Sequence, residues 1–314
     1  MGASEVRRRL IEAGARTWTY DTLSDADPPR NALCITRSPD FDDRSDLPAW
    51  RVREQRRPHL IARLTDFDRY RCTIASSGVS STLRYRSEVS IRDVLQRDCP
   101  ICIDITSLPM SVWGPLVRVA IMDDRELWLV YAEPAEYQAH KRPTPPELFD
   151  LSERVGDVEA LPGMARLAGP SPDTPLLLVV LLGFEGGRAR HIATTLEPEP
   201  RIVPVVAAPG MHAEYATQAV ECNREFLENT GAFGHIHWVD AVCPFSVRDL
   251  LGDIASEHSG SYMYVAPVGT KPHALGALLY FLSCPSGCEI IYDDPTARKD
   301  GTSGIGKTHL YRVN

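Results

Sequence analysis

The sequence predicts an α/β protein made of two tandem Rossmann-like domains with mainly parallel sheets. The first observation is a pattern that occurs twice: a buried strand, a small polar turn closed by proline, a helix, and a second strand ending in Tyr-x-acid-Pro. The two copies span residues 101–134 and 262–295. The second observation is the strict alternation of strand and helix patterns after residue 175, which requires right-handed crossovers and a parallel sheet. A repeat of this kind indicates a duplicated unit.

Residues 1–145 form the first predicted domain. The dense apolar run at 101–105 is typical of a strand buried on both faces of a parallel sheet. The other elements follow from apolar spacing, which recurs every three or four residues in helices and alternates in strands. In chain order they are a helix at 4–13, strands at 32–36 and 71–76, a helix at 89–96, a strand at 101–105, a helix at 110–122 and a strand at 127–131.

Residues 146–174 are predicted as a linker because they are rich in proline and polar residues. Residues 175–314 form the second predicted domain. Its strands are expected at 176–182, 201–207, 235–239, 261–268 and 289–292, and its helices after 183, after 209, at 246–257 and at 272–282. Residues 308–313 alternate like an edge strand.

The candidate site lies at the carboxyl ends of the strands, where open parallel sheets bind ligands. Loops that contain glycine fall at this edge, and helix N-termini there offer unpaired N–H groups to an anion. The candidate ligand-binding residues are Gly183, Glu185, Gly186, Gly187, Arg188, Gly210, Gly269, Thr270, Lys271 and His273, with Thr106 and Ser107 in the corresponding turn of the first domain. No residue stands out as catalytic.

Two of these loops carry a cation. Thr270 is suited to cap a helix that Pro272 begins. A lysine beside a helix N-terminus is locally unfavourable, so Lys271 indicates an anion between the two; the alternative is a capped helix with an exposed lysine. Arg188 offers a planar donor fork after the glycine turn, or is simply solvated.

Residues 301–308 match the Walker A expression G-x-x-x-x-G-K-[ST]. We reject a P-loop because a P-loop needs a buried strand before it and a long helix after it. Here a charged segment precedes the match, and only six residues follow it.

Composition narrows the function classes further. The formal charge of −8 argues against a nucleic-acid backbone as the main partner, because phosphate binding requires a local basic surface. It does not exclude a small anion held by a few local donors. The eight cysteines lie mostly in apolar patterns and are expected to be reduced thiols, so we predict neither a metal site nor a cofactor. The charged N-terminus and the absence of a long apolar run favour a cytoplasmic protein without a membrane segment.

At Gly269-Thr-Lys-Pro and the following Leu-Gly-Ala-Leu, the second half resembles the CRISPR-associated Rossmann fold (CARF) family of ligand-sensing domains. Gly183–Arg188 and Gly269–His273 match the family's two ligand loops, and Thr106 and Ser107 lie in a degenerate copy without the lysine. The resemblance implies a small anionic nucleotide as ligand, such as a cyclic oligonucleotide, and a setting in prokaryotic anti-phage defence. It also implies an effector protein as partner. It leaves open whether the sensor is a homodimer or an internal pair of the two halves.

Two functions remain as hypotheses. The first is a nucleotide-sensing module that signals to a partner protein, for which differential affinity between two conformations suffices. The second is a nucleotide-processing enzyme, such as a ring-nuclease-like phosphodiesterase that uses Thr270 and Lys271. An enzyme needs a positioned acid, base or nucleophile, and the sequence shows no such constellation.

Overall fold

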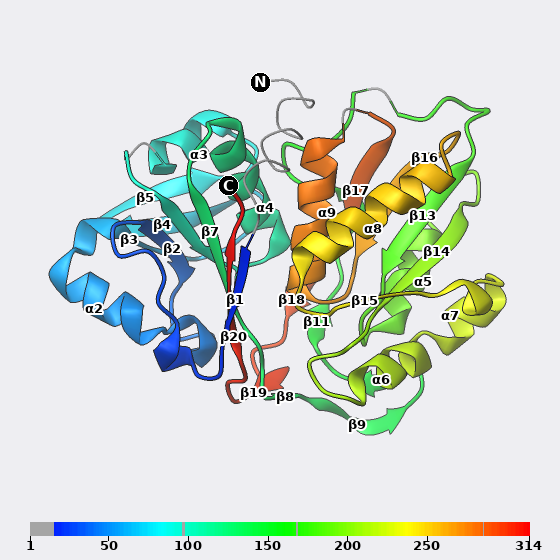
Figure 1. Ribbon diagram of the computed structural model, residues 1–314, viewed down its shortest axis with the longest axis horizontal. Helices are drawn as coiled ribbons and strands as arrows, with labels where there is room; N and C mark the ends of the chain where they lie inside the picture. The colour runs from blue at the N-terminus through cyan, green and yellow to red at the C-terminus, as the bar shows by residue number, and fades with distance from the viewer. Residues whose placement is uncertain (1–15, 96–97, 168, 285) are drawn as a thin grey trace. The chain divides into compact units, whose positions relative to one another are not determined.

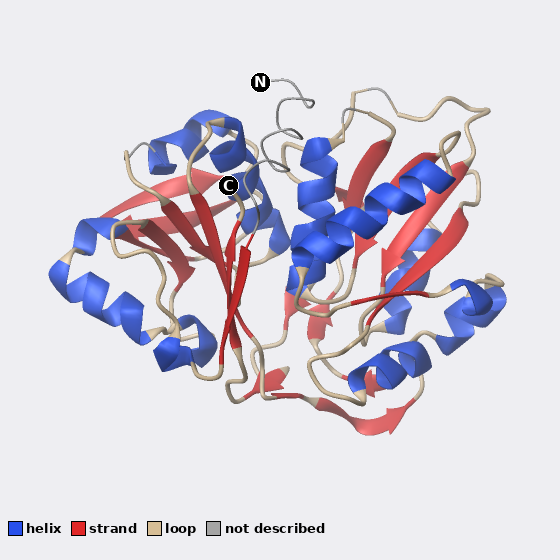
Figure 2. Ribbon diagram, in the orientation of Figure 1, coloured by secondary structure: helices blue, strands red, loops and turns tan. Residues whose placement is uncertain are grey.

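The computed structural model describes residues 16–314 except 96–97, 168 and 285, so the predicted helix at 4–13 lies outside the described residues. The protein has an α/β fold with two mixed sheets, each in its own compact unit (Figure 1). Unit 1 contains the described residues up to Glu136 together with Thr302–Asn314, and unit 2 contains Tyr137–Gly301. Figure 2 shows that helices accompany both sheets.

Unit 1 contains an eight-stranded sheet in the order β1-β20-β7-β6-β2-β3-β4-β5. The four central strands, β7, β6, β2 and β3, are parallel, and antiparallel strands flank them on both sides. The strands are β1 (Arg16–Tyr20), β2 (Leu33–Arg37), β3 (Ile61–Thr65), β4 (Arg71–Ser76), β5 (Val79–Arg84), β6 (Ile101–Asp104), β7 (Leu127–Ala132) and β20 (Thr308–Arg312). The α-helices are α2 (Pro48–Arg56), α3 (Glu88–Leu95) and α4 (Met110–Met122), and short 3-10 helices occupy Leu23–Asp25, Asp43–Ser45 and Pro58–Leu60.

The end of the chain differs from the sequence prediction. Residues 308–313, expected as an edge strand of the second domain, form β20, which lies between β1 and β7 in the sheet of unit 1. Leu310 and Tyr311 are fully buried there. Alternating hydrophobicity identifies a strand but not its partner strands. The sequence pattern therefore does not show that the end of the chain joins the sheet of unit 1. The Walker A match contains β19 (Thr302–Ser303) and leads into β20. No helix follows it among the described residues, which agrees with the rejection of a P-loop.

Unit 2 contains a six-stranded sheet in the order β12-β17-β16-β13-β14-β15, parallel except for the edge strand β12. The strands are β12 (Glu159–Ala160), β13 (Leu176–Leu181), β14 (Arg201–Ala207), β15 (His237–Val239), β16 (Tyr262–Pro267) and β17 (Cys288–Tyr292). The helices are α5 (Gly186–Ala193), α6 (Tyr215–Cys222), α7 (Arg224–Asn229), α8 (Pro244–Glu257) and α9 (Lys271–Ser283), with a 3-10 helix at Phe233–His235. Short strands elsewhere are β8 (Glu136–Tyr137), β9 (Ala139–Thr144), β10 (Glu147–Phe149), β11 (Ser152–Arg154) and β18 (Thr296–Ala297).

Most predicted elements are present, but β1, β3 and β5 of unit 1 have no counterpart in the prediction, and two regions of unit 2 differ. The helix expected after residue 209 is broken at Asn223 into α6 and α7. The segment predicted as a linker, 146–174, contributes β10, β11 and β12, and these strands pair with β9, β18 and β17. Short strands of two or three residues are too brief to show an alternating pattern, so their polar sequence resembles a loop.

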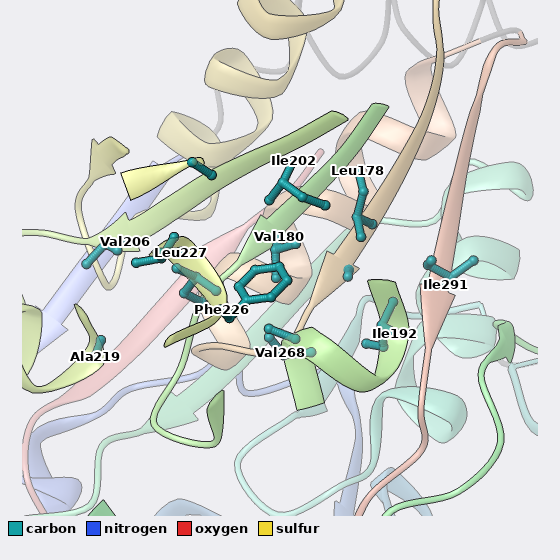
Figure 3. Close-up of a cluster of buried hydrophobic side chains, with 14 residues drawn as sticks. Leu178, Val180, Ile192, Ile202, Val206, Ala219, Phe226, Leu227, Val268 and Ile291 are labelled. Atoms are coloured by element: carbon teal, nitrogen blue, oxygen red, sulfur yellow. The ribbon is translucent and has the colours of Figure 1, made fainter. Parts of the chain in front are cut away.

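The core of unit 2 forms around β13, whose six residues are all buried. Alternate residues of β13, Leu178 and Val180, pack with apolar side chains of α5, α6 and α7 (Figure 3). Continuous burial on both faces is expected of a central parallel strand covered by helices. This packing fixes the carboxyl end of β13, from which the first ligand loop emerges.

The parallel strands of the two units follow the same order. In unit 1, the order β7-β6-β2-β3 places the first two parallel strands of the unit beside its last two, and in unit 2 the order β17-β16-β13-β14 does the same. Unit 2 continues with β15, whereas unit 1 continues with the antiparallel hairpin β4–β5. In both units the strand order reverses beside the first parallel strand, which is where a crevice forms in sheets of this type.

Candidate ligand pocket

Unit 2 contains a pocket at the carboxyl ends of its central strands. It encloses about 630 Å³, part of which is open to solvent. Its walls include the loops that follow β13, β14 and β16. Six of the predicted ligand-binding residues line it: Gly183, Glu185, Arg188, Gly210, Gly269 and Thr270. The structure therefore brings together three loops that lie far apart in the sequence.

Two glycines set the geometry of the pocket where the strand order reverses. A Cβ atom on Gly183 would lie 2.5 Å from the carbonyl oxygen of Val268, and one on Gly269 would lie 2.6 Å from that of Leu182. Both distances are well below van der Waals contact, so a side chain at either position would push the two loops apart. The loops after β13 and β16 thus touch backbone to backbone, which only glycine permits here.

The two glycines that begin α5 have different roles. A Cβ on Gly186 would lie 1.9 Å from the carbonyl oxygen of Cys222, so this glycine allows α5 to pack against the end of α6. A Cβ on Gly187 would meet nothing within 4 Å. Neither glycine is among the residues that line the pocket. Both glycines were expected to let the backbone approach a ligand. Gly186 instead lets the backbone approach a neighbouring helix.

Arg188 is part of a buried ion pair. Its Nε and Nη2 atoms donate to the two carboxylate oxygens of Asp293 at 2.7 and 2.6 Å, and its Nη1 lies 3.3 Å from Glu185 Oε2. Burial lowers the pKa of Arg188, but the hydrogen bonds and the charge of Asp293 outweigh it and raise the pKa overall. The guanidinium fork expected for a ligand is thus directed at a carboxylate, and Arg188 is neither solvated nor an open anion site. Asp293 lies 105 positions after Arg188 in the chain, so no local sequence pattern indicates this pairing.

Glu185 places a carboxylate in the pocket wall. Its side chain is 19% exposed, and its Oε2 atom also accepts a hydrogen bond from Ser152 Oγ at 2.9 Å. A carboxylate here repels phosphate but accepts hydrogen bonds from hydroxyl or amino groups. The charge of the pocket wall therefore favours an uncharged, hydrogen-bond-donating part of a ligand.

Thr270 caps α9 as predicted. Its Oγ1 atom accepts from the N–H of His273 at 3.3 Å and donates to the carbonyl oxygen of Ala241 at 3.0 Å. The second bond ties the loop after β16 to the loop after β15. Lys271, half-buried, is the first residue of α9, one position earlier than the sequence indicated, and Pro272 follows inside the first turn.

His273 is fully buried behind this cap. Its Nε2 atom lies 2.9 Å from the carbonyl oxygen of Asp240, and its Nδ1 atom has no hydrogen-bond partner within the described residues. Burial lowers its pKa to about 4, although the bond to Asp240 opposes the shift. His273 is therefore a neutral imidazole in the core, and it does not line the pocket that it was expected to serve.

Sequence reasoning missed an aromatic cluster on the pocket wall. The rings of Tyr137, Phe184 and Tyr215 contact one another with centroid distances of 5.1 to 5.6 Å, and all three residues line the pocket. Phe149 stacks on Phe184 at 4.4 Å. The rings come from separate segments, and a single aromatic in each segment gives no periodic signal. Such a wall can stack a planar group.

Asn223, also missed, holds the first ligand loop in place. It is buried between α6 and α7, and its Nδ2 atom donates to the carbonyl oxygens of Gly183 at 2.8 Å and Ala219 at 2.7 Å. Because Gly183 and Ala219 both line the pocket, this amide links two of its walls. Because the sequence pattern predicts a single helix across this position, no local signal distinguishes Asn223 from a polar residue inside a helix.

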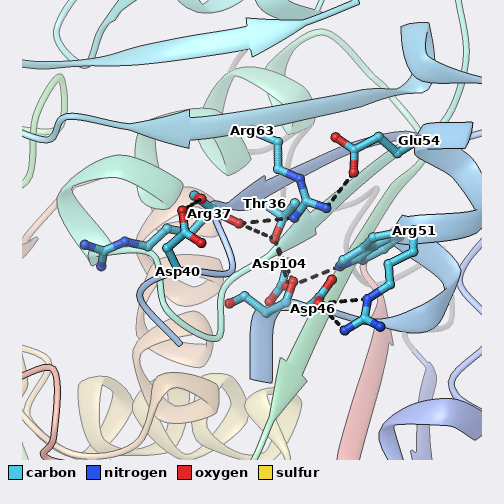
Figure 4. A network of polar contacts seen from close by, with 11 residues as sticks. Thr36, Arg37, Asp40, Asp46, Arg51, Glu54, Arg63 and Asp104 are labelled. Atoms are coloured by element: carbon cyan, nitrogen blue, oxygen red, sulfur yellow. Dashed lines mark hydrogen bonds and ion pairs between the residues drawn. The ribbon is translucent and has the colours of Figure 1, made fainter. Parts of the chain in front are cut away.

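Thr106 and Ser107 occupy the corresponding edge of unit 1, and both are buried. Ser107 Oγ lies 2.6 Å from Ser45 Oγ, while Thr106 Oγ1 accepts from the N–H of Ala132 at 3.0 Å. Asp104, at the end of β6, accepts from the Oγ1 atom of Thr36 at 3.1 Å (Figure 4). These hydroxyl groups therefore bind other parts of the protein.

The described residues contain no cluster of three or more metal-ligating side chains, and each of the eight cysteines is a free thiol. Within the same part of the chain, no helix has the length and apolarity needed to cross a membrane. In comparisons with protein families, curated proteins and solved structures, nothing matches this chain.

Proposed function

We propose that unit 2 is a nucleotide-binding module, and that the pocket at the carboxyl ends of β13, β14 and β16 is its binding site. The aromatic wall at the point of strand-order reversal carries this proposal. Phe184 and Tyr215 offer faces on which a nucleobase can stack, and Glu185 offers an acceptor to its amino group or to a ribose hydroxyl. Lys271, the first residue of α9, follows the pocket-lining residue Thr270, and its ammonium group offers a charged donor to a phosphate.

The fold supports a sensor built from two related Rossmann-like units. The parallel strands have the same order in both units, and the repeated segments 101–134 and 262–295 supply equivalent strands and helices in each. Together with the resemblance of the two ligand loops to the CARF family, this favours a cyclic oligonucleotide as the ligand and an effector protein as the receiver of the signal. The setting in prokaryotic anti-phage defence rests on that resemblance alone.

Isothermal titration with a panel of mononucleotides and of linear and cyclic oligonucleotides tests the proposal. We expect Phe184→Ala to weaken binding of the best ligand about five- to a hundredfold, because base stacking on an aromatic ring contributes roughly 1–3 kcal/mol. Trp238→Ala is the matched control, since Trp238 is 55% exposed on the edge strand β15 and does not line the pocket. Equal losses in the two variants, or no binding by any member of the panel, would refute the proposal.

Lys271→Ala tests the phosphate end of the site separately. A charge-assisted contact contributes about 1.5–3 kcal/mol, so we expect a loss in affinity of roughly ten- to a hundredfold with little change in melting temperature. Affinity equal to that of the parent protein would remove Lys271 from the site while leaving the aromatic wall untouched.

The same samples distinguish a sensor from a nucleotide-processing enzyme. After incubation, chromatography and mass spectrometry show whether the bound nucleotide is intact. We expect it to be intact, because a sensor needs only differential affinity. Breakdown that is lost in Lys271→Ala would assign the pocket to a phosphodiesterase instead.

A further inference from the structure

The β4–β5 hairpin of unit 1 carries an exposed cluster of basic and aromatic side chains. We define the arginine–tyrosine patch as Arg69, Tyr70, Arg71, Arg84 and Arg86, all of which are exposed. The pairing of the hairpin brings them together. Arg71 is opposite Arg84 in the antiparallel register, and the N–H of Tyr85 donates to the carbonyl oxygen of Tyr70 at 3.0 Å.

Tyr70 forms the centre of this patch. Its ring is flanked by the guanidinium groups of Arg69 and Arg86, whose central carbons lie 5.9 and 5.8 Å from the ring centroid. Cations at this distance are attracted to an aromatic face. The side chain nevertheless remains 57% exposed, so much of the ring is accessible to a ligand from solvent.

The patch is locally basic although the chain as a whole carries a formal charge of −8. In the two segments that carry the arginines, 66–71 and 84–88, the acidic side chains are Asp66, Asp68 and Glu88, and Glu88 is paired with Arg92 of α3 and Arg118 of α4. Asp68 lies 3.2 Å from Arg71 Nε, and its pKa is lowered, first by the N–H of Tyr70 and then by Arg71. Like charges directly opposite one another destabilise an antiparallel pair, so Arg71 and Arg84 would both gain from a bound anion.

The surface beside the patch is open and lined with small side chains. Thr73 and Thr82 are the next cross-strand pair on the face that carries Arg71 and Arg84. At this end of the hairpin the opposite face holds the buried pair Cys72 and Leu83, so it is covered beside the patch. An accessible surface with one exposed ring and several guanidinium groups suits a flexible polyanion whose bases are unpaired.

We propose that the arginine–tyrosine patch binds single-stranded nucleic acid, with a base stacked on Tyr70 and phosphates contacted by the surrounding arginines. This site lies in unit 1 and is independent of the pocket proposed for unit 2. The negative charge of the whole chain does not oppose it, because phosphate binding depends on the local surface.

Fluorescence anisotropy with the full-length protein and a fluorescein-labelled 20-nucleotide oligo(dT) or oligo(U) tests this proposal. Tyr70→Ala should weaken binding roughly five- to a hundredfold, as expected for the loss of one stacked base, whereas Tyr70→Phe should retain it. Contacts to three or four phosphates predict a slope of about −2 to −3 for log K against log salt, and Arg84→Gln should reduce its magnitude by about 0.7.

Arg224 and Phe233 in unit 2 provide the matched control. The Arg224 guanidinium lies 5.6 Å from the ring of Phe233, which is 40% exposed, but Arg224 is also paired with Glu221 and Glu228. Because this arginine–aromatic pair has acidic surroundings, Phe233→Ala and Arg224→Gln should leave oligonucleotide affinity unchanged.

Three outcomes would overturn the proposal. The first is no binding at 50 mM salt, and the second is equal affinity for Tyr70→Ala and the parent. The third is equal or tighter binding to a DNA duplex or to phosphatidylserine vesicles, because neither presents an unpaired base to Tyr70. Melting temperatures of the variants accompany each titration, and Tyr70→Phe separates the loss of the ring from a loss of folding.

Discussion

The two units order their central parallel strands in the same way but treat the carboxyl ends of those strands differently. In unit 1 the polar side chains at this edge form hydrogen bonds within the protein: Asp104 accepts from Thr36 Oγ1 and Trp50 Nε1, and Arg37 donates to the carbonyl oxygen of Ser107. In unit 2 the corresponding loops meet through Gly183 and Gly269, and an aromatic-walled pocket lies beside them. The shared strand order determines where a crevice can form. The side chains that follow each strand determine whether a pocket is present there.

The two edges also differ in how a buried ionisable side chain interacts with its surroundings. Asp104 in unit 1 has a raised pKa, because burial outweighs the hydrogen bonds from Thr106, Trp50 and Thr36. Arg188 in unit 2 is also buried but lies against a carboxylate on another segment. The neutral donors around Asp104 do not offset the effect of its burial, whereas the opposite charge of Asp293 stabilises the charged form of Arg188. Mutations at the two edges should therefore have different consequences.

The largest expected effect is on the ion pair that supports the open edge. Arg188→Ala leaves Asp293 buried without its partner, so we expect a loss of about 3–5 kcal/mol in the free energy of unfolding. Arg190→Ala, two residues along the same helix, removes an exposed pair with Glu225 and should cost less than about 1 kcal/mol. Urea denaturation measures both. If the two variants are equally stable, Arg188 does not have the structural role assigned to it.

A somewhat smaller effect is expected from pH. The folded-state pKa of His273 is lowered to about 4, against 6.5 for an ordinary histidine, so the unfolded state binds its proton first as the pH falls. The contribution of His273 to the free energy of unfolding is fully present above pH 6.5. It falls by about 3 kcal/mol as the pH is lowered to 4. His273→Gln retains a donor for Asp240 and should lack this part of the pH dependence. Urea denaturation at pH 7, 5.5 and 4 compares the two proteins, and parallel curves would contradict the assignment.

The smallest expected effect comes from giving the edge of unit 2 a side chain of the kind found in unit 1. Gly269→Ser places a Cβ atom 2.6 Å from the carbonyl oxygen of Leu182, and such overpacking costs about 1–3 kcal/mol. Gly187→Ala is the control, since a Cβ there meets nothing within 4 Å and the change should be neutral or stabilising by up to about 1 kcal/mol. Thermal melts report both changes. A destabilised Gly187→Ala beside an unaffected Gly269→Ser would reverse the assigned roles.

The sequence was sufficient for features encoded locally. The strand at Arg201–Ala207 and the helix at Met110–Met122 have the predicted bounds, and Thr270 caps α9 as its position before Pro272 indicated. Local patterns work there because hydrophobic spacing and capping involve residues only a few positions apart. The rule that ligand loops gather at the carboxyl ends of parallel strands also located the pocket.

The remaining features depend on partners that are distant in the chain. Arg188 resembled an anion ligand because Asp293 is far away in sequence, and β20 resembled an edge strand because its neighbours β1 and β7 lie in the first half. Tyr137 and Tyr215 join Phe184 only after both ligand loops have folded. Interpreting such residues needs three-dimensional contacts, which a single sequence does not contain.

The central claim is that only the open edge, in unit 2, binds the nucleotide. A crystal structure of the protein soaked with the tightest-binding member of the nucleotide panel tests it most directly. We predict density for a base against Phe184 and Tyr215, with a phosphate near the first turn of α9. Density at the edge of unit 1 beside Asp104 and Ser107, with the pocket of unit 2 empty, would contradict the account.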